Sequence, residues 1–301
     1  MNLCTSTLFG YDFDSVLEIA SESGCKGIEL RVADNCHKSL EELTLAGSYI
    51  KNTILKSGLN PAVLNSYISI EDEYSVSKLL HAAVTMEVPQ VRVVLPLAAN
   101  AAVRMQARIK EGIPSYESKL KPRELINQLK LTIGHLEGRA RSAGVKVLLE
   151  LHWGTVMSSF TSAYLLLKEF DSDYIGITFD PANMEVEGKE DWEYGLSLIS
   201  DYVSNVHVKN VSWKKTEEGW IWEWSGLKEG MLDWSNLVLL LNKVGYKGDY
   251  AIEDFCMPGN NKPEAKKYIS QFQKDFEEIN RGISELSMFN GNKYSELISC
   301  V

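Results

Sequence analysis

The chain has 301 residues, of which 45% are hydrophobic and 24% are charged, with a formal net charge of -10 and a pI near 5.1. This composition is typical of a folded globular chain with a sizeable core and excludes a disordered polypeptide. The surplus of acid argues against a protein that grips nucleic acid, because phosphate backbones are bound by clustered lysine and arginine. We therefore expect a small-molecule partner.

The cysteines and the N-terminal stretch indicate the cellular compartment of the protein. The five cysteines are scattered and show no CxxC spacing, which predicts reduced thiols and a cytoplasmic protein. The stretch MNLCTSTLFGYDFDSV has no basic region followed by an apolar run, and no segment is long and apolar enough to cross a bilayer. We expect no membrane partner.

Short apolar runs alternate along the chain with longer amphipathic segments, which is the pattern of repeated βα units and a parallel sheet. Eight strands are predicted: NLCTST near residue 3, KGIELRV from Lys26, LNPAVLNS from Leu59, QVRVVLPL from Gln90, VKVLLELHW from Val145, IGITFD from Ile175, VSNVHVKNV from Val203 and DYAIEDF from Asp249.

Helix-like segments lie between these strands, with apolar residues three and four positions apart. Those at residues 14–24, 39–58 and 121–144 each close at a glycine, which suits a helix C-cap. The last helix is expected at residues 262–289, before a polar tail at residues 290–301. Eight strand–helix pairs predict a single (β/α)8 TIM barrel at residues 1–289, with active-site residues at the C-terminal ends of its strands.

Four of the predicted strands end in side chains that bind metals. Glu150 and His152 lie two residues apart at the end of the fifth strand, so they point to the same side. Asp180 ends the sixth strand, His207 lies in the seventh and Glu253 in the eighth. Three carboxylates at one barrel mouth need a shared cation, because an unpaired buried carboxylate is costly.

We therefore predict one divalent metal ion bound by Glu150, Asp180, His207 and Glu253. The majority of oxygen donors favours Mn²⁺ or Mg²⁺, with Co²⁺ or Zn²⁺ as alternatives. No GxGxxG follows a strand, and neither GxxxxGK[ST] nor GxSxG occurs, so no nucleotide cofactor is expected.

Three polar residues near the predicted ligands are candidates for substrate binding. His152 is expected to orient Glu150 or to contact a substrate hydroxyl. Asn183 is expected either to bond substrate or to cap the next helix. Lys209 shares the side of the seventh strand on which His207 lies, and it could hold an anionic group of the substrate or restrain a metal carboxylate through a salt bridge.

Two further features remain open in the sequence. Trp220, Trp222 and Trp224 lie in an enlarged loop after the seventh strand, residues 213–230, which is expected to form either a β-hairpin on its own scaffold or a lid over substrate. Glu29 and Arg31 in the second strand are expected either to reach the barrel mouth or, as the preferred interpretation, to form a simple ion pair inside the barrel.

Four stretches of the sequence resemble successive motifs of the sugar phosphate isomerase/epimerase family, which has a xylose isomerase-like TIM barrel. These stretches are LLELHWG, FDPAN, VHVKN and GMLDWSNLVLLLNKVGYKGDYAIEDF. The resemblance implies a metal held by Glu150, Asp180, His207 and Glu253. The family includes ketose epimerases, hydroxypyruvate isomerase, inosose dehydratase, dehydroshikimate dehydratase and the related endonuclease IV. This chain has Asn183 where several epimerases have a histidine, and Lys209 where they carry an arginine.

These features predict a divalent-metal-dependent isomerase or epimerase of a small keto-sugar or polyhydroxy carbonyl compound. Glu150 and Glu253 would remove and return a proton from opposite sides, through a metal-stabilised enediolate. The alternative is a metal-dependent lyase, either a dehydratase of the keto-inositol or dehydroshikimate type or a deglycosidase. An endonuclease would need more histidines and a basic groove, and a non-catalytic binding protein is disfavoured because all four ligand positions are intact. The sequence allows a homo-oligomer.

Overall fold

The computed structural model describes residues 1–97, 120–217, 219–257 and 261–298, with side chains described up to residue 283. Each of the eight predicted strands is present in it. The barrel strands are β1 (Asn2–Cys4), β2 (Gly27–Val32), β3 (Asn60–Ser69), β4 (Gln90–Val94), β5 (Lys146–Glu150), β6 (Ile175–Phe179), β7 (Val203–Val208) and β10 (Asp249–Ile252).

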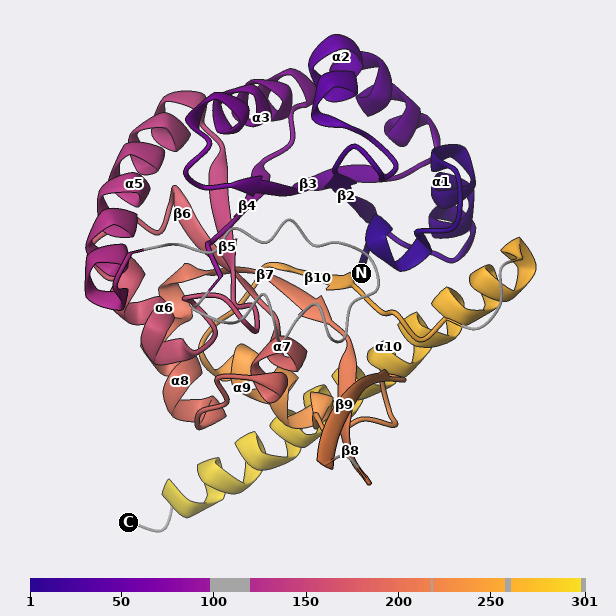
Figure 1. Cartoon of the computed structure of the whole chain (residues 1–301). Coiled ribbons are helices and arrows are strands. Elements are labelled where there is room, and N and C mark those ends of the chain that lie inside the picture. Colours follow the sequence, from indigo (N-terminus) through magenta and orange to yellow (C-terminus); the bar gives the residue numbers. More distant parts are fainter. Residues whose placement is uncertain (98–119, 218, 258–260, 299–301) are drawn as a thin grey trace.

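These strands form one closed parallel barrel, in which β1 completes the ring between β10 and β2. Figure 1 shows the helices arranged around the outside of the strands. The strands are rich in aliphatic residues because both of their faces are covered, and Val147, Leu148 and Leu149 of β5 are all fully buried. The predicted single (β/α)8 TIM barrel is confirmed.

The outer layer consists of helices whose ends follow local sequence signals. Its helices are α1 (Phe13–Glu22), α2 (Leu40–Lys56), α3 (Glu73–Met86), α5 (Pro122–Ala143), α6 (Phe160–Leu167), α7 (Pro181–Val186), α8 (Trp192–Ile199), α9 (Trp234–Lys243) and α10 (Lys262–Ile298). Ser39 and Glu42 form a capping box at the start of α2. Gly144 ends α5 with a φ of 65°, a conformation that glycine adopts readily.

The predicted polar tail at residues 290–301 lies outside the residues whose side chains are described, so the boundary at residue 289 stays a prediction. Within the described part of the chain, no helix is both long enough and apolar enough to span a membrane.

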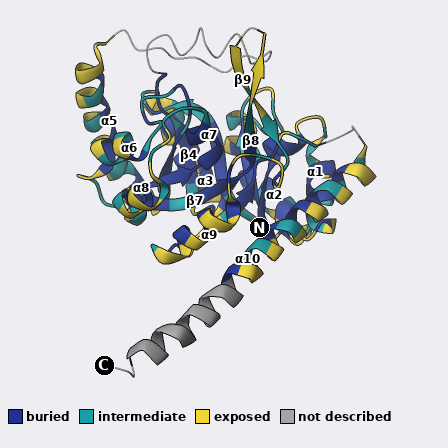
Figure 2. Ribbon diagram, turned by 90° about the horizontal axis from the view of Figure 1, so that it is seen from below, coloured by how far each residue is buried: buried dark blue, intermediate teal, exposed yellow. Residues whose placement is uncertain are grey.

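The enlarged loop after β7 contains a β-hairpin of two antiparallel strands, β8 (Asn210–Thr216) and β9 (Gly219–Ser225). Figure 2 shows this hairpin standing out from one end of the barrel, with its tip exposed. The hairpin alternative predicted for this loop is confirmed, and its action as a lid stays a prediction.

Candidate metal centre

Four side chains with metal-binding chemistry meet at the end of the barrel where β5, β6, β7 and β10 finish. They are Glu150 at the end of β5, Asp180 after β6, His207 near the end of β7 and Glu253 after β10. One ligand atom from each lies within 4.8 Å of the others, and all four residues are buried. The structure therefore brings together the four residues predicted as ligands, and this cluster could hold a metal ion.

Asp180 is positioned by the helix that follows it. Its Oδ1 accepts a hydrogen bond of 3.0 Å from the backbone N–H of Asn183, which makes Asp180 the N-cap of α7. Pro181 suits the first helical position because it has no N–H to satisfy. The Oδ2 atom of Asp180 is buried and accepts no well-aligned hydrogen bond, although Lys209 Nζ lies 2.6 Å away. A buried carboxylate oxygen in this state fits a cation ligand.

The imidazole of His207 has carboxylates beside both of its nitrogens. Nδ1 lies 3.2 Å from Glu150 Oε1, 3.4 Å from Asp180 Oδ2 and 3.1 Å from Glu253 Oε2. Nε2 lies 2.8 Å from Glu29 Oε1. Burial alone would lower the pKa of His207, but the carboxylates of Glu253 and Glu29 raise it well above its usual value. The contact with Glu29 leaves Nδ1 facing the three acids, as metal-ligating histidines are commonly held.

Glu150 is paired with a buried arginine from the neighbouring strand. Arg92 Nη2 contacts Glu150 Oε2, and both side chains are almost fully buried. The other oxygen, Oε1, accepts a hydrogen bond of 3.3 Å from Asn183 Nδ2. Burial alone would raise the pKa of Glu150, but the Arg92 guanidinium lowers this pKa well below its usual range. The carboxylate therefore stays ionised near neutral pH.

Glu253 is paired with Lys209, which follows β7. Lys209 Nζ lies 2.6 Å from Glu253 Oε2 and 2.6 Å from Asp180 Oδ2. Ser6 donates a hydrogen bond of 3.4 Å to Glu253 Oε1. Against the effect of burial, His207 and Lys209 lower the pKa of Glu253 well below its ordinary value. The salt bridge predicted as one role of Lys209 is present, and its contact with substrate stays a prediction.

A network of buried hydrogen bonds links β2, β3 and β4 to this cluster. Arg92 Nη1 donates to Asn65 Oδ1 at 2.7 Å, and Asn65 Nδ2 donates to Glu29 Oε1 at 2.7 Å. Arg92 also contacts Glu150, and Glu29 contacts His207, so the network ends on two of the candidate ligands. Buried hydrogen-bond networks of this kind restrict the orientation of their members.

Three members of this network, Arg92, Asn65 and Glu29, lie outside the predicted site. The predicted ion pair between Glu29 and Arg31 is wrong, because Glu29 accepts from Asn65 while the Arg31 guanidinium lies 4.1 Å from the ring centroid of Tyr67. The sequence does carry a signal for them. Each interrupts an apolar strand, GIELRV, AVLNS or VRVV, with a group that is costly to bury without a partner.

The other two residues predicted to bind substrate lie beside the cluster. His152 Nδ1 lies 2.7 Å from the carbonyl oxygen of Trp153, which can only accept, so Nδ1 carries the proton of the neutral ring and Nε2 is its acceptor. Burial lowers the pKa of His152, which favours the neutral ring. Asn183 does not cap α7, since Asp180 does, so that alternative is wrong. Asn183 Oδ1 is buried without a hydrogen-bond partner, and the substrate contacts of both residues stay predictions.

An aromatic band joins the loops on the same side of the mouth. The ring centroids of Trp153 and Trp222 lie 5.2 Å apart, those of Trp222 and Trp224 lie 4.8 Å apart, and those of Trp224 and Phe255 lie 5.7 Å apart. Lys209 Nζ lies 4.9 Å from the ring centroid of Trp224. The hairpin is therefore packed against Trp153, Lys209 and Phe255, which follow β5, β7 and β10.

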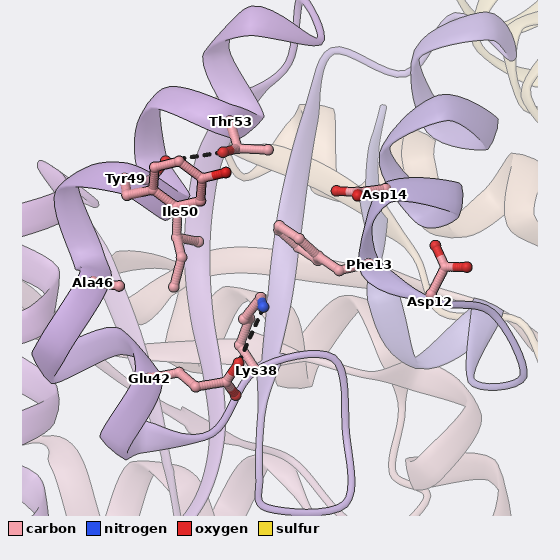
Figure 3. A pocket seen from close by; sticks show the side chains of 9 residues that line it. All are labelled: Asp12, Phe13, Asp14, Lys38, Glu42, Ala46, Tyr49, Ile50 and Thr53. Carbon is pink, nitrogen blue, oxygen red and sulfur yellow. Dashed lines mark hydrogen bonds and ion pairs between the residues drawn. The ribbon is translucent and has the colours of Figure 1, made fainter.

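A separate hollow of about 390 Å³ lies between α1 and α2 (Figure 3). Phe13, Ala46 and Ile50 contribute apolar side chains to its lining, and Lys38 bonds Glu42 at 3.1 Å beside them. None of the residues predicted for the site lines this hollow. It is distinct from the candidate metal centre.

The sequence and the structure were compared with known proteins. A family model described as xylose isomerase-like TIM barrel matches residues 17–275. Among curated proteins, none matches the sequence.

Several solved structures have the same fold. An IolI protein with a bound zinc atom matches with a TM-score of 0.67 and 16% sequence identity, over 94% of this chain and 96% of that chain. The 3-keto-D-glucoside 4-epimerase YcjR from E. coli matches with a TM-score of 0.65 and 15% identity, over 91% and 98% of the two chains. The probable 3-DHS dehydratase AsbF from Bacillus anthracis matches with a TM-score of 0.64 and 19% identity, over 91% and 97%. At these identities, the likeness shows the fold alone.

Proposed function

Because the chain belongs to the xylose isomerase-like TIM barrel family, we propose that it is a divalent-metal-dependent isomerase or epimerase of a small keto-sugar or polyhydroxy carbonyl compound. The observation that carries this proposal is the buried cluster of Glu150, Asp180, His207 and Glu253. The structural relatives include an epimerase and a probable dehydratase, which supports an enzyme.

The charge of the cluster supports a divalent ion. The cluster holds four buried carboxylates and two permanent cations, which are Glu29, Glu150, Asp180, Glu253, Arg92 and Lys209. With His207 neutral, as a metal ligand must be, two negative charges remain, and an unbalanced buried charge is costly. One divalent ion on the four ligands would restore neutrality, and three oxygen donors with one nitrogen donor favour Mn²⁺ or Mg²⁺. A bound ion of this kind supplies Lewis acidity, which makes a proton next to a carbonyl group easier to remove.

Glu150 and Glu253 are the proposed proton carriers. They approach the mouth from β5 and β10, with β6 and β7 between them in the barrel. Both carboxylates have lowered pKa values, so both are ionised near neutral pH, which is the form that a proton acceptor must have. One would remove the proton and the other would return it from a different direction, as inversion or transfer requires.

The proposed substrate contacts are His152, Asn183 and Lys209. The buried Oδ1 of Asn183 would accept a hydrogen bond from a substrate hydroxyl, and Nε2 of His152 would do the same. Lys209 already bonds two acids, so it would reach a substrate oxygen only in addition to those contacts.

A metal-dependent lyase is the second candidate, and His152 favours it. A lyase shares the first proton abstraction but then expels a leaving group, so it needs one base and not two opposed carboxylates. The neutral imidazole of His152, with Nε2 as acceptor, suits that base. The substrate would then be of the keto-inositol, dehydroshikimate or glycoside type.

Incubation of metal-loaded protein with keto-sugars in D₂O separates these possibilities. An isomerase or epimerase should place solvent deuterium on the carbon next to the carbonyl, which proton NMR detects as loss of that signal. A lyase should release water or another leaving group and form an enone or deoxy product. If a broad panel of keto-sugars and keto-inositols shows neither exchange nor elimination, the proposed function is contradicted.

A further inference from the structure

We infer that Arg31 forms an anion-binding subsite at the barrel mouth, so that the substrate carries a carboxylate or phosphate group. The inference rests on the proposed function, because it names the chemical class of substrate for the same site.

Arg31 is a half-buried cation without an acid. Its guanidinium carbon lies 5.2 Å from the ring centroid of Phe9 and 4.1 Å from that of Tyr67. Its Nε is buried and has no hydrogen-bond partner. Within the described part of the chain, no carboxylate lies within ion-pair distance of Arg31, and its side chain bonds the thiol of Cys36. An external anion would supply the missing partner.

Arg92, which contacts the same Tyr67 ring, has the carboxylate partner that Arg31 lacks. The guanidinium carbon of Arg92 lies 4.8 Å from the ring centroid of Tyr67, and Arg92 is neutralised by Glu150. The chain has 41 acidic residues against 31 lysines and arginines, so acids are in excess. Leaving Arg31 unpaired where acids are plentiful is unfavourable for folding, and such a cost is common where a site is kept ready for a ligand.

The position of Arg31 fits a substrate-binding role. Arg31 lies two residues after Glu29 on the same face of β2, about 6–7 Å further toward the C-terminal end of the strand. Glu29 itself contacts His207 of the metal cluster. A small sugar acid can span such a distance, with its carbonyl end at the cluster and its anionic end at Arg31.

The chemistry of Arg31 also fits an anion. The rings of Phe9 and Tyr67 attract the guanidinium through its charge but accept no strong hydrogen bonds, which leaves its N–H groups for an anion. Those N–H groups match two oxygens of a carboxylate or phosphate at once. Lys209 is the other cation predicted for an anionic group, but it is already bonded to Asp180 and Glu253.

Calorimetric titration of Mn²⁺-loaded protein tests this subsite without turnover. The probes are D-glucose, D-glucuronate and D-glucose 6-phosphate, which differ in the group at one end. The variants are Arg31→Met, Arg31→Lys and the matched control Arg139→Met, which removes an arginine that pairs with Glu73 on the outer helices. We expect Arg31→Met to weaken binding of the acidic probes about tenfold or more. Arg31→Lys should recover part of that lost affinity, and Arg139→Met should leave the affinity unchanged.

Wild-type protein should bind at least one acidic probe more tightly than glucose, and the stronger of the two identifies carboxylate or phosphate as the anion. Equal binding of acidic and neutral probes, binding of none of the three, or acidic binding that survives Arg31→Met would overturn the inference. Metal content of the same samples separates this failure from that of the proposed function. Stoichiometric Mn²⁺ with no acid preference contradicts the subsite alone, whereas absence of bound Mn²⁺ contradicts both.

Discussion

The half of the barrel mouth formed by β5, β6, β7 and β10 differs from the half formed by β1 to β4. The first half supplies the candidate metal ligands Glu150, Asp180, His207 and Glu253. The second half adds none of these four, but Glu29 and Arg92 from it bond to ligands of the first half. All four candidate ligands therefore come from one half of the mouth, and the other half contributes two of the residues that support them.

This division separates two kinds of loss. Removal of one of the four ligands in the first half deletes a metal donor. Removal of Glu29 or Arg92 from the second half leaves all four donors but takes away a contact that orients or neutralises one of them. The first should abolish metal binding, and the second should weaken it or destabilise the fold. The following changes test this difference, from the largest effect to the smallest.

Asp180→Ala should have the largest effect. It removes a ligand and leaves Glu150 and Glu253 with one oxygen donor fewer for the shared cation, so bound metal should fall from about one per chain to near zero. Elemental analysis after dialysis against Mn²⁺ measures this. Asn183→Ala is the control in the same helix, and it should spare metal and weaken substrate binding by about 1–2 kcal/mol through one lost hydrogen bond. Equal occupancy in wild type and Asp180→Ala would contradict the assignment.

Arg92→Met should have the next largest effect, on stability. It leaves the buried carboxylate of Glu150 without its cation, which should lower the free energy of unfolding by about 3–5 kcal/mol in chelator-treated protein. Urea denaturation measures the change. The double variant Arg92→Met/Glu150→Gln removes the stranded charge and should recover much of the loss. An equal loss in the single and double variants would show that the pair does not matter.

Glu29→Gln should weaken metal binding without abolishing it. The amide keeps a hydrogen-bond acceptor for His207 but loses the charge that orients and polarises the imidazole, which should reduce Mn²⁺ affinity about 10- to 100-fold. Competition with a metal-sensitive dye measures the affinity. Glu42→Gln, in the capping box at the start of α2, is the matched control. Unchanged affinity in Glu29→Gln would remove the support role from this half of the mouth.

Two ion pairs that Glu18 makes on the outer helices should show the smallest effect. Hydrogen bonds from Lys262 and Lys266 lower the pKa of Glu18 from 4.5 to about 2. The stabilisation that ionised Glu18 gives to the fold is therefore complete above about pH 4.5 and is lost as the pH falls toward 2. The difference in unfolding free energy between wild type and Glu18→Gln should be small at pH 7, shrink in high salt and vanish near pH 2. A large difference that is insensitive to salt would contradict this.

The strands and the ligand cluster could be predicted because both are local features of the sequence. VLLELHW shows an apolar run that ends in Glu150 and His152, and the alternation of side chains along a strand places both on one side. Asp180 and Glu253 end similar runs. In a parallel barrel, all strands end at the same face, so these positions converge without any knowledge of the pairing register.

The supporting residues could not be predicted because their partners depend on neighbouring strands. Arg92 of β4 lies in register with Asn65 of β3. Glu29 of β2 lies in register with Val63 of β3, in a strand pair whose register shifts between Ile28 and Glu29. No pattern within one strand fixes that register. The predicted Glu29–Arg31 pair failed for this reason, since it considered one strand alone.

The cap of α7 also depended on a boundary that the sequence leaves open. FDPAN offers both Asp180 and Asn183 as polar residues near a helix start. The end of β6 at Phe179 makes Asp180 the cap and places Asn183 in the first turn. Element boundaries shift easily by a few residues, and a cap is defined by such a boundary.

Anomalous diffraction from crystals grown with Mn²⁺ tests the metal centre most directly. We expect one anomalous peak, with one atom each from Glu150, Asp180, His207 and Glu253 about 2.0–2.3 Å from it. His207 should bind through Nδ1 while Nε2 keeps its contact with Glu29. No peak within the cluster, or a peak bound by other residues, would contradict the assignment of these four side chains as the metal ligands.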